Sequence, residues 1–235
     1  MSNIIAAIAQ TLDLDASVFD PFVVPCTTLT EMKTPTQFRM FRYDRPQGTE
    51  PTINAEKHKD LGLLSLVIGH SPGLQVLDVN TSAWIPIEND TALPPGYRTR
   101  SGGLTATLLG GETLSFLTRG NYKAGVHRVV CDPVSVAGDP FRFSIVYTLR
   151  PAVAPLFTKV FESGITGVFD PQERCEGESS AVLFDRIMRS HWNINAAKEV
   201  RERQQEDQRR RVEEGQAKDG VSVGVVEQFG KPLSG

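Results

Sequence analysis

The sequence predicts a mainly β protein, an antiparallel sandwich or barrel with helices before and after it. From about residue 36 to 150 the chain consists of short apolar runs with β-branched residues, separated by Gly and Pro. Short strands with frequent turn signals are typical of this class. Helical periodicity is found near the N-terminus and again after about residue 180. No fixed-period repeat is present, which argues against a solenoid or propeller.

The expected strands are short runs bounded by turn signals, such as Ser-Pro-Gly at 71–73 and Gly-Gly at 110–111. The segments are Gln37–Tyr43, Leu63–Ile68, Leu74–Val79, Thr105–Leu109, Thr113–Leu117, Val126–Cys131 and Phe141–Leu149.

Helices are expected on either side of this region. Ile4, Ile5, Ile8 and Leu12 form an apolar stripe within 3–12. A second helix is expected over 180–214, and its mixed acidic and basic side chains indicate a solvated face. The predicted divisions are an N-terminal helical segment (1–35), a β core (36–151), a C-terminal helical extension (152–214) and a loosely ordered tail (215–235).

Composition excludes several classes of protein. The 25 Lys and Arg residues nearly balance 28 Asp and Glu residues, so a general phosphate-binding surface is not expected. The basic run Arg209–Arg211 has acidic neighbours that cancel its field. Three widely spaced cysteines support neither a disulfide framework nor a zinc ribbon. The N-terminal sequence resembles neither a signal peptide nor a membrane span. We therefore expect a cytoplasmic protein that binds neither nucleic acid nor membrane.

His58, Asp60 and His127 are the candidate metal ligands. On an extended segment, positions i and i+2 point to the same face, so His58 and Asp60 can bind adjacent positions of one ion. His127, in a strand-like run, could complete a two-His, one-carboxylate set, which suits non-haem Fe(II). A lone His-x-Asp is weak evidence, since Asp60 could cap a turn and His127 could be a core histidine.

Arg142 and Ser144 are candidates for binding an anion. They alternate with Phe141, Phe143 and Ile145, so the guanidinium and the hydroxyl are expected to share one face of a strand. Burying an arginine is costly unless an anion pairs with it, and a carboxylate fits both donors. The alternative is that Arg142 pairs with a local acid such as Asp139.

These features occur in an order that resembles the 2-oxoglutarate/Fe(II)-dependent dioxygenases of the isopenicillin N synthase-like family. The similarity covers roughly residues 36–151, and the motifs are specific only in combination. They are Phe38-Arg-Met-Phe-Arg-Tyr43, His58-Lys-Asp60-Leu-Gly-Leu-Leu-Ser-Leu, Gly73-Leu-Gln-Val-Leu, Trp84-Ile-Pro, Gly111-Glu-Thr-Leu-Ser-Phe-Leu-Thr, Gly120-Asn-Tyr-Lys-Ala-Gly-Val-His127-Arg-Val and Arg142-Phe-Ser144-Ile-Val-Tyr-Thr-Leu-Arg-Pro.

The resemblance implies a double-stranded β-helix (jelly roll) core with flanking helices and Fe(II) at one open end. His58, Asp60 and His127 would be the catalytic iron ligands. Arg142 and Ser144 would bind the distal carboxylate of 2-oxoglutarate, and Tyr43 would also contact this cosubstrate. The Asn that commonly precedes that Tyr by two residues is replaced by Phe41. The implied activity is oxidation of a C–H bond in a small organic molecule of specialised metabolism, using O2 and decarboxylating 2-oxoglutarate to succinate.

Two other functions are compatible with the sequence. An iron enzyme could use a co-oxidant other than 2-oxoglutarate, although Arg142 and Ser144 argue against it. A catalytically silent jelly-roll binding or assembly subunit is the alternative from a different class. Only about 35 residues precede the first matching strand, fewer than is usual in the family. We therefore expect the C-terminal helix, loops or a second subunit of a homodimer to help enclose the site.

Overall fold

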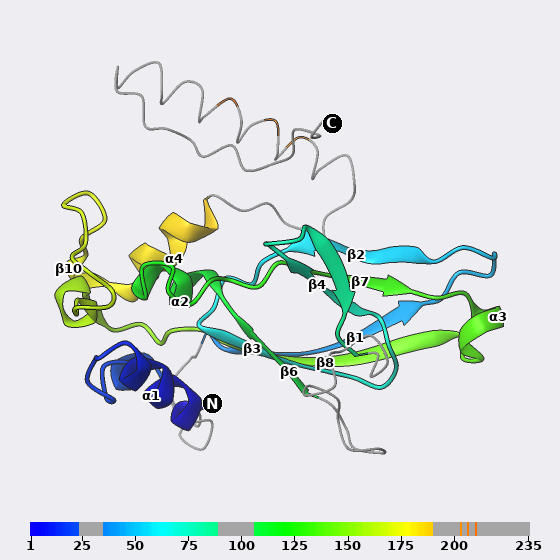
Figure 1. Ribbon diagram of the computed structural model, residues 1–235, viewed down its shortest axis with the longest axis horizontal. Helices are drawn as coiled ribbons and strands as arrows, with labels where there is room; N and C mark the ends of the chain where they lie inside the picture. The colour runs from blue at the N-terminus through cyan, green and yellow to red at the C-terminus, as the bar shows by residue number, and fades with distance from the viewer. Residues whose placement is uncertain (24–34, 89–105, 190–202, 204–205, 207–209, 211–235) are drawn as a thin grey trace. The chain divides into compact units, whose positions relative to one another are not determined.

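The computed structural model describes residues 1–23, 35–88 and 106–189, together with residues 203, 206 and 210 (Figure 1). The chain divides into two units, residues 1–191 and 192–235. In the second unit the three described residues are helical and exposed, as expected for the charged helix. The first part of the helix predicted over 180–214 is described in the first unit, whereas most of its residues after 189 and the predicted tail lie outside the described residues.

Two four-stranded antiparallel sheets form the core of the first unit (Figure 1). The first has the order β1-β8-β3-β6 and the second the order β2-β7-β4-β5. Every neighbouring pair except β4 and β5 joins strands that are not consecutive in sequence, and the two sheets form the expected double-stranded β-helix. Their bounds are β1 Gln37–Asp44, β2 Thr52–His58, β3 Leu64–Gly69, β4 Leu74–Asp78, β5 Ala83–Pro86, β6 Ala106–Gly110, β7 His127–Cys131 and β8 Phe141–Leu149.

Short elements complete the described part of the chain. A third antiparallel pair joins β9 to β10, and short helices lie before, between and after the strands. Their bounds are α1 Ser2–Thr11, η1 Asp20–Phe22, α2 Glu112–Leu117, α3 Val134–Ala137, β9 Pro155–Phe157, η4 Thr158–Phe161, β10 Glu176–Ser179 and α4 Ser180–Met188.

The apolar interior has two parts. The smaller lies within the jelly roll and is formed by Val67, Leu74, Leu109, Val129 and Cys131. The larger joins α1, α2, α4 and the ends of strands β3 and β8, with several buried aromatic rings. The helices therefore extend the core beyond one end of the jelly roll rather than only covering its surface.

The N-terminal helix forms as predicted but buries a slightly different face. Ile5, Ile8 and Leu12 are buried, whereas Ile4 is 39% exposed. Successive helical residues point about 100° apart, so the buried Ile5 and Ala9 lie on one side of Ile8 around the helix, and Ile4 lies on the other side, at the edge of the buried stripe.

One predicted strand is wrong. Residues 113–117 form most of helix α2, which begins after Gly111. Thr113, Leu114 and Leu117 are buried at helical spacing, and this packing against the larger core overrides the β-branched composition. Strand β2 was not predicted because its side chains are mostly polar and exposed. Its hydrogen bonds to β7, rather than an apolar pattern, define it as a strand.

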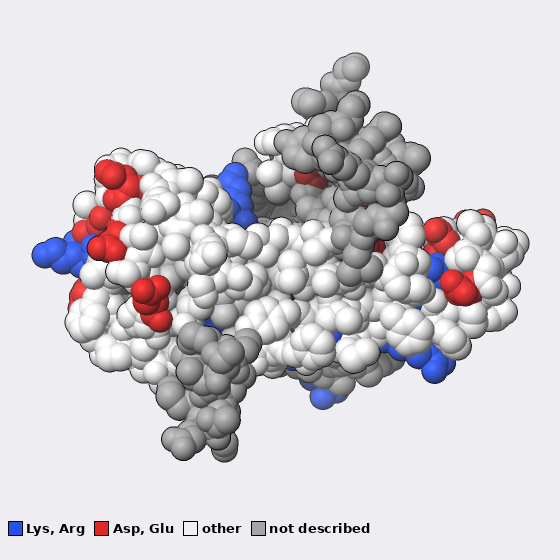
Figure 2. Space-filling view, turned by 90° about the horizontal axis from the view of Figure 1, so that it is seen from below, with Lys and Arg blue, Asp and Glu red and all other residues white. Residues whose placement is uncertain are grey.

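The outer face of the first sheet carries exposed apolar side chains. Phe38 and Met40 on β1 are 64% and 72% exposed, and Phe143 on β8 is 44% exposed. In the view of Figure 2 the charged side chains lie mainly toward the two ends of this side of the molecule. Among the described residues no helix is long and apolar enough to cross a membrane.

Candidate metal centre

The two candidate histidines face each other across one strand pair. His58 is the last residue of β2 and His127 the first of β7, and the register of the two strands places them directly opposite. Their ring centroids are 4.2 Å apart. Asp60 follows β2 by two residues, so the chain needs only a short turn to bring its carboxylate to the same place. The strand register thus assembles a cluster from positions far apart in the sequence.

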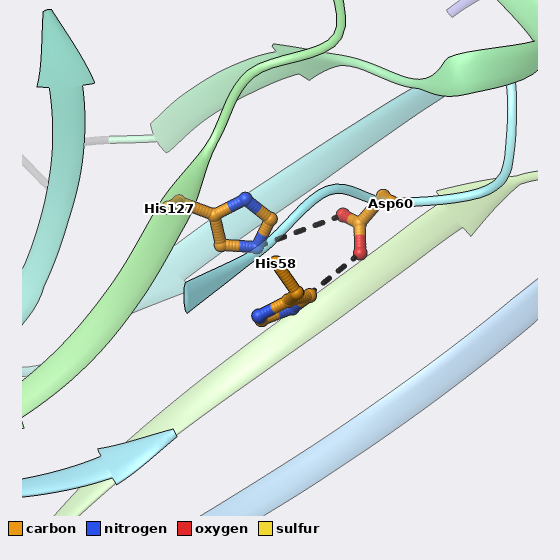
Figure 3. Close-up of side chains that lie close together, drawn as sticks. All are labelled: His58, Asp60 and His127. Atoms are coloured by element: carbon orange, nitrogen blue, oxygen red, sulfur yellow. Dashed lines mark ion pairs between the residues drawn. The ribbon is translucent and has the colours of Figure 1, made fainter. Parts of the chain in front are cut away.

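The side chains of His58, Asp60 and His127 converge on a common point (Figure 3). Their potential ligand atoms all lie within 4.8 Å of one another. Asp60 Oδ1 is 3.8 Å from His58 Nε2, and Asp60 Oδ2 is 4.0 Å from His127 Nε2. Both separations are too long for hydrogen bonds. Within the described part of the chain, Asp60 Oδ2 is buried without a hydrogen-bond partner, which is costly for a carboxylate oxygen unless a cation occupies the space between these groups.

Backbone carbonyls hold both imidazole rings in place. His58 Nδ1 is 2.7 Å from the Glu56 carbonyl oxygen, and His127 Nδ1 is 3.0 Å from that of Gly125. A carbonyl can only accept, so each Nδ1 must carry a proton and donate it. Each neutral ring then has its lone pair on Nε2, the atom that faces Asp60. Partners of this kind orient metal-binding histidines in proteins. These carbonyl partners could not be identified from sequence patterns.

Helix α2 fixes the backbone around Asp60. The amide of Glu112 donates to the Asp60 carbonyl at 2.8 Å, and the amide of Gly111 donates to the Leu63 carbonyl at 2.9 Å. The first amides of a helix have no partner within the helix, and here the 60–63 turn accepts from them. A Cβ on Gly111 would collide with the backbone of Gly62. Glycine is therefore needed where the helix starts, and its close approach determines the position of Asp60.

Arg142 and Ser144 lie side by side on the inner face of β8. Arg142 is fully buried and Ser144 is 3% exposed, whereas Phe143 between them points outward. Arg142 Nε donates to the Ser71 carbonyl oxygen at 3.0 Å. Its Nη1 is buried and has no hydrogen-bond partner in the described ranges of the chain. A buried guanidinium nitrogen without an acceptor is a potential contact point for a bound anion.

Arg142 already pairs with one carboxylate, that of Glu88. Its Nη2 lies 2.9 Å from both Glu88 oxygens. Asp139 was the partner considered from the sequence. The structure instead pairs Arg142 with Glu88, which is more distant in sequence. Glu88 lies two residues after the end of β5. Its position after the apolar run of Trp84 was the one available signal.

Tyr43 lies next to this arginine. It is opposite Arg142 in the β1–β8 register, and the guanidinium carbon is 5.6 Å from the centre of the phenol ring. Burial raises the pKa of Tyr43 above its ordinary value, while hydrogen bonding to Ser144 and the charge of Arg142 oppose the shift. At neutral pH Tyr43 is therefore a neutral phenol that can donate a hydrogen bond. The structure groups Tyr43, Arg142 and Ser144, as expected from the sequence.

The histidine cluster and the arginine face the same interior. His127, Val129 and Cys131 alternate inward along β7. Burial raises the pKa of the Cys131 thiol, and the nearby charge of Arg142 opposes this shift. One end of the inward face of β7 thus contributes to the histidine cluster and the other lies near Arg142. A ligand between the two sheets could reach both groups.

Comparison with curated proteins identifies related sequences. No protein-family profile matches the chain. The 2-oxoglutarate-dependent dioxygenase frbH of a Dothideomycetidae species is 32% identical over 111 residues, which are 47% of this chain and 30% of that protein. The oxidoreductase vrtI of Penicillium aethiopicum is 31% identical over 123 residues, which are 52% of this chain and 26% of that protein. The chain thus spans less than a third of the length of these relatives.

Comparison with solved structures supports the fold. A 2OG-Fe(II) oxygenase family protein from Caulobacter crescentus aligns with a TM-score of 0.55 and 23% identity, over 80% of this chain and 54% of that one. A Neurospora crassa protein crystallised with alpha-KG aligns with a TM-score of 0.52 and 21% identity, over 78% and 51% of the two chains. At these identities the alignments support the jelly-roll fold and nothing finer.

Proposed function

We propose that this chain, which belongs to the 2-oxoglutarate/Fe(II)-dependent dioxygenase family, is a non-haem iron oxygenase. It oxidises a C–H bond of a small organic molecule, by hydroxylation, desaturation or ring formation, and converts 2-oxoglutarate to succinate. The observation that carries this proposal is the convergence of His58, Asp60 and His127 around an unpartnered, buried carboxylate oxygen.

The residues present fit an Fe(II) ion. Two imidazole nitrogens and one carboxylate oxygen on one side of the metal are the donor set of non-haem iron oxygenases. Because each Nδ1 donates to a backbone carbonyl, the lone pair of each ring is on Nε2, the atom that would bind the metal. The cation would also satisfy Asp60 Oδ2, which has no hydrogen-bond partner among the described residues. We therefore assign His58, Asp60 and His127 as the iron ligands and the catalytic residues.

The interior also fits the cosubstrate. 2-Oxoglutarate has a carboxylate at each end, and a buried guanidinium is the preferred partner for such a group. Arg142 offers the unpartnered Nη1, and Ser144 and Tyr43 offer hydroxyl groups beside it. We assign Arg142 and Ser144 to the distal carboxylate and Tyr43 to a supporting contact.

Bound iron and 2-oxoglutarate would supply the oxidising chemistry, in which O2 is consumed and the keto acid loses CO2. The protein would position the metal and the cosubstrate and provide the charged groups that bind them. Asp60 provides the negative charge that offsets the metal, and the two carbonyl-bound histidines keep their rings oriented. Arg142 and Ser144 would fix the far end of the cosubstrate. The apolar residues between the sheets, among them Leu74 and Val129, limit access of water.

The proposal extends to partners and location. The substrate is a small molecule, O2 is the co-reactant, and neither nucleic acid nor a membrane is bound. We propose the cytoplasm as the location on the basis of the scattered cysteines, which do not support a disulfide framework. A homodimer is the assembly to test by light scattering.

A catalytically silent binding or assembly subunit is the alternative. It would gain nothing from burying unpartnered polar atoms at Asp60 and Arg142, since each lowers the stability of the fold. An iron enzyme with another co-oxidant would have no use for Arg142 Nη1. Both alternatives therefore leave unexplained a feature that the oxygenase proposal explains.

Succinate formation tests the proposed function. The protein is incubated in air with Fe(II), ascorbate and 2-oxoglutarate, and succinate is quantified with and without the metal. We expect succinate that depends on Fe(II), and a loss of about 100-fold or more in Asp60→Asn, which removes the anionic ligand. Asp78→Asn is the matched control, because Asp78 caps an exposed turn and should be replaceable without effect. Succinate that is independent of Fe(II) or of Asp60, or none from a folded protein, would contradict the proposal.

A further inference from the structure

The pairing of Glu88 with Arg142 has an unusual geometry. An arginine and a carboxylate commonly form two parallel hydrogen bonds that use two guanidinium nitrogens. Here both Glu88 oxygens contact the single nitrogen Nη2, each at 2.9 Å, and Nη1 has no hydrogen-bond partner among the residues that the structure describes. The guanidinium is therefore neutralised by Glu88 while one of its donors is left unused.

The protein is built to accommodate this pair. The Arg142 side chain is fully buried and that of Glu88 is 8% exposed. The amide of Leu74, at the start of β4, donates to Glu88 Oε2 at 2.7 Å. A Cβ on Gly69 would collide with both members of the pair, and one on Gly73 would lie 2.7 Å from Arg142 Cδ. Two glycines thus leave the space that the pair fills.

We propose that Glu88 is a resident competitor for the cosubstrate. Its carboxylate occupies the guanidinium that the proposed function, on which this inference rests, assigns to the distal carboxylate of 2-oxoglutarate. The two carboxylates have the same charge and the same preferred partner. Binding of 2-oxoglutarate therefore requires either that Glu88 move away from Nη2 or that the two carboxylates share the single positive charge of Arg142.

The competition lowers affinity for 2-oxoglutarate in a specific way. Like charges brought together in a water-poor interior repel each other strongly. A keto acid without a distal carboxylate would not approach Arg142 and would not meet this repulsion. Glu88 thus reduces the advantage of 2-oxoglutarate over shorter keto acids, and it raises the concentration of 2-oxoglutarate needed to fill the site.

Glu88→Gln isolates this effect. The amide keeps the shape of the side chain and can accept hydrogen bonds from Leu74 and Arg142, but it has no charge. Binding of 2-oxoglutarate and of 2-oxobutyrate to the Mn(II)-loaded protein is measured without O2 by calorimetry. We expect Glu88→Gln to bind 2-oxoglutarate about 10-fold more tightly or better, with 2-oxobutyrate unchanged.

Glu162→Gln is the matched control. Glu162 also lies near an arginine, Arg174, at 3.8 Å and accepts a hydrogen bond from a backbone amide, that of Phe169, at 3.0 Å. These contacts of Glu162 do not involve Arg142. We therefore expect Glu162→Gln to leave the dissociation constants of 2-oxoglutarate and 2-oxobutyrate unchanged. If Glu88→Gln does not fold, Glu88→Asp retracts the carboxylate by one methylene and should tighten 2-oxoglutarate binding several-fold.

The outcomes separate the inference from the proposed function. Unchanged or weaker binding of 2-oxoglutarate in a folded Glu88 variant would show that Glu88 is a structural partner of Arg142, and the oxygenase assignment would stand. Equal tightening of both keto acids would also refute competition at Arg142. If neither the wild type nor Glu88→Gln binds 2-oxoglutarate in the presence of metal, the proposed function fails together with this inference.

Discussion

Replacing His127 with alanine is expected to lower the affinity of the protein for Mn(II) or Fe(II) by about 100-fold or more. Loss of even an indirect partner of a metal ligand typically costs 10- to 100-fold in affinity, and His127 would be a direct ligand. The variant should also lose iron-dependent succinate formation. Calorimetric titration with Mn(II) in the absence of O2 measures the affinity without interference from oxidation.

His70→Ala is the control for this variant. His70 is exposed and its Nδ1 accepts from the amide of Phe143, outside the histidine cluster. We expect the metal affinity of the His70→Ala protein to match that of the wild type. Since His127 is buried, thermal unfolding of each apo protein must show that the fold is retained. Wild-type affinity in a folded His127→Ala protein would refute the assignment of His127 as a ligand.

Replacing Arg142 with alanine is expected to destabilise the protein by about 3–5 kcal/mol. The substitution leaves the buried Glu88 carboxylate without its counterion, which is the costly way of breaking a buried pair. The free energy of unfolding in urea measures this loss. The single variant is therefore a poor test of cosubstrate binding, because low affinity could reflect partial unfolding.

The double variant Arg142→Gln/Glu88→Gln separates the two effects. It removes both charges, so most of the lost stability should return. Compared with Glu88→Gln alone, it should bind 2-oxoglutarate about 10- to 100-fold more weakly, because hydrogen bonds to a charged partner contribute roughly 1.5–3 kcal/mol. Metal affinity should be unchanged. If the double variant binds 2-oxoglutarate as tightly as Glu88→Gln, Arg142 does not hold the cosubstrate.

The geometry of the candidate site followed largely from local patterns. The spacing of His58 and Asp60 and the alternation around Arg142 and Ser144 correctly placed side chains on shared faces. These are properties of an extended chain and need no knowledge of distant residues. That His127 lies opposite His58 depends on the pairing of β2 with β7, which local sequence patterns do not describe. The family resemblance, and not the strand register, therefore grouped these two histidines at the sequence level.

Interactions between distant residues were beyond such patterns. Glu88 is 54 residues from Arg142, and Asp139, much closer in sequence, was an equally reasonable partner. Helix α2 was predicted as a strand because Thr113 and its neighbours have strand-like composition, while contacts with the core select the helix. In both cases the decisive energy comes from tertiary contacts, which composition and spacing do not describe.

The most direct test of the account is anaerobic titration of the wild-type protein with Fe(II) and 2-oxoglutarate, followed by visible absorption. Chelation of the keto acid to iron produces a metal-to-ligand charge-transfer band that neither component gives alone. We expect the band to appear and to saturate at one iron per chain. No band from a folded protein that binds Fe(II) would contradict the oxygenase assignment and would favour a catalytically silent subunit.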